Sequence, residues 1–91
     1  MAKKKAIKLS EARIIVYLEN SDKTLHFVRK ISNKLEMDYG YTIKILSSML
    51  EKQWICRDKS LAHPSRSYYH LTANGKIKLI DARNVTAEAV E

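Results

Sequence analysis

The side chains best suited to chemistry lie in one segment, residues 38–52. Four of its residues recur at the 3.6-residue spacing of a helix and are expected to face inward: Thr42, Ile45, Leu46 and Met49. The other side then carries aromatic, hydroxyl and basic side chains. Such groups exchange hydrogen bonds with base edges in a DNA groove, and lysine reaches guanine or phosphate. We expect base contacts from Tyr39, Tyr41, Thr42, Lys44 and Ser47. Thr42 is thus assigned both to the inward-facing residues and to the base contacts.

A second set of residues is suited to contacts with the DNA backbone. The segment just before residue 38 carries a basic stripe of Arg29, Lys30 and Lys34. Gly40 is a further expected backbone contact, because a missing side chain lets the chain approach a phosphate near a helix N-terminus. Ser48 is another, because its hydroxyl can form a hydrogen bond with a phosphate. In the polar stretch 58–66, the expected contacts are Lys59, His63 and Arg66.

These same residues have plainer interpretations. Residues 38–52 are also typical of a solvated amphipathic helix, and residues 58–66 of an ordinary polar loop. Adjacent exposed tyrosines, with Ile43 beside them, would equally suit a protein partner. The lysines of residues 1–8 form either a solvated tail or a basic arm that meets phosphates.

Composition limits the class of protein. The chain has 91 residues, with 17 Lys and Arg against 10 Asp and Glu, a formal net charge of +7. This length fits one small domain, and 45% hydrophobic residues are typical of a globular chain. Two glycines and one proline favour helices over an all-β sandwich. A basic domain attracts polyanions, whether nucleic acid, acidic protein or membrane surface.

The sequence offers little for catalysis, cofactors or metals. A glycine-rich phosphate loop, a carboxylate pair and a nucleophile elbow are all missing, so we expect neither an enzyme nor a cofactor. His26, His63 and His70 share no metal-ligand spacing with Cys56, and a metal site is not expected. A single cysteine excludes a disulfide framework, and no apolar run approaches a membrane span. We expect a cytoplasmic, nucleoid-associated protein.

The elements that must position these residues follow from capping, turn and hydrophobic patterns. Helices are predicted at 10–19, 24–35, 38–52 and 72–84, with Ser10, Asp38 and Thr72 as N-caps of the first, third and last. Strands at 54–57 and 67–71 form a hairpin. The fold class is α+β, mostly helical: a basic arm at 1–8, one domain at 9–84, and a flexible tail at 85–91.

At this point the chain resembles the winged-helix DNA-binding domains of MarR-, PadR- and ArsR-type regulators. The resemblance rests on residues 37–42, on 49–55, and on the step from Leu71-Thr72 to Gly75. It implies a recognition helix near 38–52, a wing near 59–66 that reaches the minor groove or backbone, and a homodimer. These families commonly have glycine where this chain has Gln53, so the recognition helix must end without a left-handed glycine.

Together these patterns lead us to expect a sequence-specific regulator of transcription that binds double-stranded DNA, in the simplest case a repressor. It would form a homodimer through helices 10–19 and 72–84. A small-molecule ligand is not expected, because the short end helices lack the span that builds a pocket between domains. Two alternatives stay open: a winged-helix module that binds protein, and an architectural protein that binds DNA without sequence preference.

Overall fold

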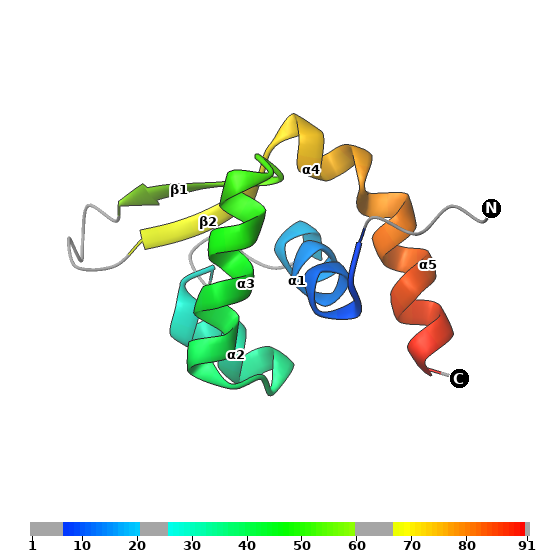
Figure 1. The fold of residues 1–91 in the computed structure, drawn as a ribbon, viewed down its shortest axis with the longest axis horizontal. Coiled ribbons are helices and arrows are strands. Elements are labelled where there is room, and N and C mark those ends of the chain that lie inside the picture. The colour runs from blue at the N-terminus through cyan, green and yellow to red at the C-terminus, as the bar shows by residue number, and fades with distance from the viewer. Residues whose placement is uncertain (1–6, 21–25, 60–66, 91) are drawn as a thin grey trace.

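The structure is a computed structural model that describes residues 7–20, 26–59 and 67–90. The elements run in the order α1 (Leu9–Asn20), α2 (Val28–Leu35), α3 (Tyr39–Glu51), β1 (Ile55–Lys59), β2 (Ser67–Leu71), α4 (Ala73–Ile77) and α5 (Leu79–Val90). Figure 1 shows α1 between α3 on one side and α5 on the other, with the hairpin projecting away from the helices. The predicted α+β class, mostly helical with a two-stranded hairpin, is confirmed.

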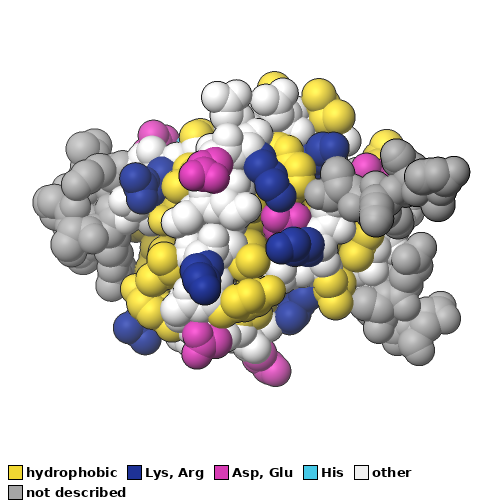
Figure 2. Space-filling view, in the orientation of Figure 1, with side chains coloured by type: hydrophobic (Ala, Val, Ile, Leu, Met, Phe, Trp, Pro, Cys, Tyr) yellow, Lys and Arg dark blue, Asp and Glu magenta, His cyan; other side chains and the backbone are white. Residues whose placement is uncertain are grey.

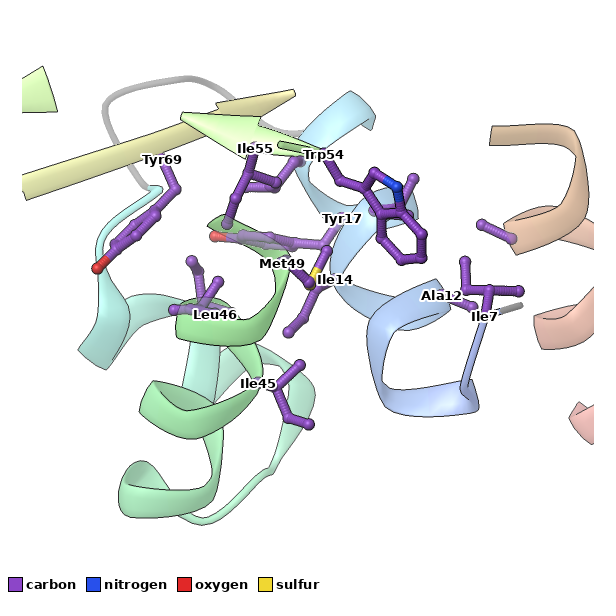
Figure 3. Close-up of a cluster of buried hydrophobic side chains, with 14 residues drawn as sticks. Ile7, Ala12, Ile14, Tyr17, Ile45, Leu46, Met49, Trp54, Ile55 and Tyr69 are labelled. Carbon is purple, nitrogen blue, oxygen red and sulfur yellow. The ribbon is translucent and has the colours of Figure 1, made fainter. Parts of the chain in front are cut away.

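A single hydrophobic core joins α1 to the other elements. Ala12, Ile14, Ile15 and Leu18 of α1 are buried, as their spacing predicts. Figure 3 shows Ile14 and Tyr17 among side chains from α3 and β1, including Met49 and Ile55. The far side of α1 packs along α5, the most extensive contact between two elements of the fold. Helix α1 therefore links α3 to the C-terminal helix.

A tight turn of three residues connects α2 to α3. Glu36 ends α2 in the left-handed region, with φ 54°, and its N–H donates to the carbonyls of Ser32 and Asn33. Asp38 then caps α3, because its carboxylate accepts the N–H of Tyr41 at 2.9 Å. The two helices pack against each other and form the predicted helix-turn-helix.

The hairpin is an antiparallel ladder with Ile55 opposite Leu71 and Arg57 opposite Tyr69. Its second strand is joined to the segment before α2, because the N–H of Tyr69 donates to the carbonyl of His26 at 2.8 Å. The His26 ring is buried, with Nδ1 3.1 Å from the carbonyl oxygen of Tyr69. This two-way link fixes the hairpin relative to α2.

The structure explains why threonine at 72 is followed by glycine at 75. The Thr72 hydroxyl accepts the N–H of Gly75 at 3.1 Å and donates to the carbonyl of Gln53. The backbone of Trp54 runs so close to Gly75 that an added Cβ would lie 2.0 Å from the Trp54 carbonyl oxygen. Thr72 therefore caps α4, as predicted, and glycine is required three residues later.

Several predicted boundaries were wrong. The second helix begins at Val28 and not at 24, because Phe27 before it has an extended backbone, with φ −108° and ψ 161°. The first strand is Ile55–Lys59 and not 54–57, because its ladder extends to Lys59 opposite Ser67. Helix α1 begins at Leu9, so Ser10 lies inside the first turn and is not the N-cap. The predicted last helix is two helices, separated at Lys78. The second continues to Val90, so residues 85–90 are helical where a flexible tail was expected, because Val85 packs against the core.

Two features bear on the surface of the molecule. Ile77 and Ile80 are 73% and 71% exposed, the highest values among the large hydrophobic residues that the structure describes. In the described ranges of the chain, every helix is too short or too polar to cross a bilayer.

Candidate nucleic-acid interface

The outer face of α3 is a narrow stripe of small and polar side chains. Ile45, Leu46 and Met49 are buried, which fixes the rotation of the helix. Gly40, Lys44 and Ser47 are exposed and follow one another at the four- and three-residue spacing that keeps side chains on one helix face. Figure 1 shows this helix beside the hairpin, with α1 between it and α5. The stripe is open to a large ligand.

Thr42 does not belong to this face. Its side chain is fully buried, with 0% exposed, and its hydroxyl donates to the carbonyl of Asp38 at 2.8 Å. The expected base contact from Thr42 is therefore wrong, because position 42 falls on the same side of the helix as Ile45 and Met49. The inward position that the spacing predicted for Thr42 is confirmed.

The two tyrosines lie on opposite flanks of the stripe, and each has a partner within the molecule. The guanidinium of Arg29 lies 4.7 Å from the ring centroid of Tyr39, on the α2 side. The Tyr41 hydroxyl donates to Oγ of Ser10 at 3.3 Å, on the α1 side. Both tyrosines stay close to half exposed, at 43% and 46%. Their rings border the stripe.

The predicted backbone contacts lie on α2, beside the stripe, and on α3 itself. Arg29 and Lys34 of α2 are exposed, and Lys30 is half-buried. Ser48 is half-buried on α3. At Gly40 the nearest atom to an added Cβ would be the Asp38 carboxylate, at 3.3 Å, so a large group can approach the backbone there.

The hairpin brings together side chains that were not assigned to the interface. Asp58 and His70 form an exposed pair, with 2.7 Å between Oδ2 and Nε2. Cys56 stands opposite His70 and is exposed. Desolvation, and to a smaller extent the Asp58 carboxylate, raise the pKa of the Cys56 thiol. The backbone of Lys59 belongs to β1, whereas His63 and Arg66 lie outside the described residues.

The charge on this face is mixed. Figure 2 shows Lys and Arg side chains interspersed with Asp and Glu around α3, without a continuous basic block. Lys44 is the basic residue of the outer stripe, and Glu51 follows at the end of the helix. Most basic side chains near α3 therefore belong to neighbouring elements and not to α3 itself.

Sequence reasoning missed one pair altogether. The Glu11 side chain is buried, with 1% exposed, and its Oε2 accepts a hydrogen bond from Nζ of Lys52 at 2.8 Å. The partners are 41 residues apart. A glutamate in the first turn of a helix is ordinarily a favourable surface residue, so the sequence held no signal of this contact.

Comparison with known proteins identifies the fold. No protein-family model and no curated protein matches the sequence. Solved structures do match: an S. aureus MepR mutant has a TM-score of 0.80 and 17% identity, covering 91% of this chain and 61% of that chain. An E. coli MarR mutant complexed with operator DNA has a TM-score of 0.74 and 13% identity, covering 92% and 59%. S. pneumoniae FabT in complex with DNA has a TM-score of 0.72 and 21% identity, covering 93% and 58%.

The matched solved structures are longer than this chain, which spans 61% of the MepR chain and 55% of another MarR-family regulator. Identities this low carry information about the fold and not about function. The chain has the winged helix-turn-helix fold of MarR-family transcription regulators.

Proposed function

We propose that this protein is a sequence-specific regulator of transcription that binds double-stranded DNA and represses by occupying its site. The observation that carries the proposal is the uncovered stripe of Gly40, Lys44 and Ser47 on the second helix of a helix-turn-helix. A helix in this position enters the major groove, where base edges are distinguishable. Two of the similar solved structures, MarR and FabT, are complexes with DNA.

Within this proposal Lys44 and Ser47 contact base edges directly, because they lie at the centre of the exposed face. The rings of Tyr39 and Tyr41 contact the groove walls or bases from the two flanks. Arg29, Lys30 and Lys34 meet phosphates beside α3, with Gly40 and Ser48 at the helix. The wing supplies further backbone or minor-groove contacts through Lys59, His63 and Arg66.

The test is selection of bound duplexes from a random pool, followed by sequencing. The proposal expects an enriched motif with two half-sites about 34 Å, one helical turn, or a multiple of this, apart. Lys30→Ala should weaken binding to enriched and random duplexes equally. It should also reduce the slope of log affinity against log salt concentration by about the amount that one phosphate contact contributes. Equal recovery of all sequences would instead identify an architectural protein without sequence preference.

We also propose a homodimer through 10–19 and 72–84, which the exposed pair Ile77 and Ile80 supports. Two isoleucines more than 70% exposed cost free energy in a monomer, and a second copy is a partner that would cover them. Light scattering should give a dimer for the wild type and a monomer for Ile80→Asp. Ile43→Asp makes the same substitution at an exposed isoleucine of α3, outside 10–19 and 72–84, and as the matched control it should stay dimeric. A monomeric wild type at high concentration contradicts this assembly.

A protein-binding module is the second candidate, and Ile43 favours it. Its side chain is 41% exposed beside two half-exposed tyrosines, which gives α3 an apolar border as well as a polar stripe. Absence of DNA binding even at low salt, with specific capture of a protein partner that Ile43→Asp abolishes, would support this function.

The proposed DNA-binding regulator is non-catalytic, needs no cofactor or small-molecule ligand, and acts in the cytoplasm at the nucleoid.

A further inference from the structure

The first turn of α1 contacts α3 near both of its ends. Ser10 accepts a hydrogen bond from the Tyr41 hydroxyl at 3.3 Å, and Glu11 accepts one from Nζ of Lys52 at 2.8 Å. Tyr41 lies in the first turn of α3, whereas Lys52 is its C-cap residue. Eleven positions separate them, about 16 Å along a helix axis. Two neighbouring residues of α1 thus hold the whole length of the helix on one flank.

Glu11 is the stronger of the two contacts. Its carboxylate is buried, and each oxygen has a partner: Oε1 accepts the backbone N–H of Lys8 at 2.9 Å, and Oε2 accepts the Lys52 ammonium. The bond to Lys8 satisfies a free N–H at the start of α1. One carboxylate therefore stabilises the start of α1 and binds the end of α3.

The Lys52 ammonium is itself confined. Its Nζ lies 4.6 Å from the ring centroid of Trp54, and Nζ of Lys78 lies 5.5 Å from the same centroid. A buried carboxylate that loses its cation keeps an uncompensated charge, which is strongly unfavourable. The native position of Lys52 is thus favoured over alternatives that release it into water.

A helix fixed at two points on one flank resists rolling about its axis and sliding along it. Roll and slide are the movements that would turn Lys44 and Ser47 away from a base edge. The same α1 packs along α5, which carries part of the proposed dimer contact. The orientation of α3 is in this way tied to the elements that would set the spacing of two half-sites.

From these contacts we infer that Glu11 is a positioning residue for sequence discrimination: it holds the C-terminal end of α3 in register with α1. The inference rests on the proposed function for its DNA consequence, while the restraint on α3 is a property of the free protein. Glu11 lies behind the outer stripe and reaches no base in this arrangement.

The test compares Glu11→Gln with Glu19→Gln, which makes the same change of charge at an exposed position of the same helix. In free protein, hydrogen exchange should accelerate in Glu11→Gln at the amides of residues 48–52, and Trp54 emission should change, because Lys52 is released from the single tryptophan. The ratio of affinities for enriched and random duplexes should fall at least about threefold. Affinity for random duplex should not fall, because the variant is more positive. Glu19→Gln should match the wild type in hydrogen exchange, in Trp54 emission and in the affinity ratio.

The inference can be overturned without refuting the proposed function. Glu11→Gln could have a lower melting temperature but wild-type hydrogen exchange at 48–52 and an unchanged affinity ratio. This result would overturn the inference, because it would make Glu11 only a stabilising residue. If Glu11→Gln does not fold, Lys52→Gln removes the other partner at a half-exposed position, and it must show the same exchange and the same loss of discrimination. A wild type that binds every duplex equally would refute the proposed function, and hydrogen exchange alone would still decide whether Glu11 restrains α3.

Discussion

The Tyr41 hydroxyl on α3 donates a hydrogen bond to Oγ of Ser10 on α1, across 31 residues of sequence and 3.3 Å of space. A side chain expected to read a base is therefore already engaged within the protein. Its ring stays 46% exposed, so apolar or stacking contact with a partner remains open to it. The hydroxyl orients the ring, and the ring is the part presented outward.

Substitutions at Tyr41 should separate these two roles. Tyr41→Phe keeps the ring and loses the bond to Ser10, which costs about 1 kcal/mol of unfolding free energy or less, and Ser10→Ala should cost the same. Tyr41→Ala removes the ring and should also weaken binding to the enriched duplex. Denaturant unfolding and fluorescence anisotropy measure the two effects. If Tyr41→Phe loses as much DNA affinity as Tyr41→Ala, the hydroxyl contacts DNA and the bond to Ser10 breaks in the complex.

Gln53 should be replaceable by glycine with a gain in stability. Its φ is 63°, in the left-handed region that costs a residue with a Cβ roughly 1 kcal/mol. Gln53→Gly removes this cost at the exit from α3, and the midpoint of urea unfolding should rise. Lys44→Gly, at an exposed position in the middle of α3, is the control and should lower the midpoint by a similar free energy. A fall in both variants would mean that the Gln53 side chain stabilises the turn more than its φ destabilises it.

Gly75 should tolerate no side chain. A Cβ there would lie 2.0 Å from the Trp54 carbonyl oxygen, and backbone cannot move aside cheaply. Gly75→Ala should cost about 2 kcal/mol or more in unfolding free energy. Asn74→Ala, one residue earlier and exposed, should change stability by less than about 1 kcal/mol. Similar thermal midpoints for the two variants would contradict the close approach of Trp54 to α4.

The Cys56 thiol should react slowly at neutral pH. Desolvation and the nearby Asp58 carboxylate raise its pKa, and the thiolate is the reactive form. Alkylation by iodoacetamide should therefore reach half of its maximal rate at a higher pH in the folded protein than in urea. Asp58→Asn removes the carboxylate, lowers the thiol pKa and should move the profile toward lower pH. Coincident profiles for the wild type and Asp58→Asn would show that Asp58 does not act on the thiol.

Periodicity predicted the parts of the site that depend on one helix. The inward set of α3 is confirmed at Ile45, Leu46 and Met49 because helical geometry alone decides it. The same rule already assigned Thr42 to the core, and including it among base contacts went against that rule.

Features that depend on packing between elements could not be predicted. The flank of α3 that faces α1 holds Tyr41 and Lys52, and only the tertiary structure shows which flank that is. Glu11 is buried for the same reason. The break at Lys78 was likewise not predicted: the sequence indicated one helix over 72–84, whereas Lys78 separates α4 from α5.

The central claim is that the exposed stripe of α3 reads DNA sequence, and Lys44→Ala tests it most directly. The measurement is the ratio of affinities for the enriched duplex and a random duplex, with Lys76→Ala as a control that removes the same charge from exposed α4. One lost base contact should lower the ratio roughly tenfold in Lys44→Ala, and Lys76→Ala should leave it at the wild-type value. An unchanged ratio in Lys44→Ala would contradict the assignment of α3 as the recognition helix.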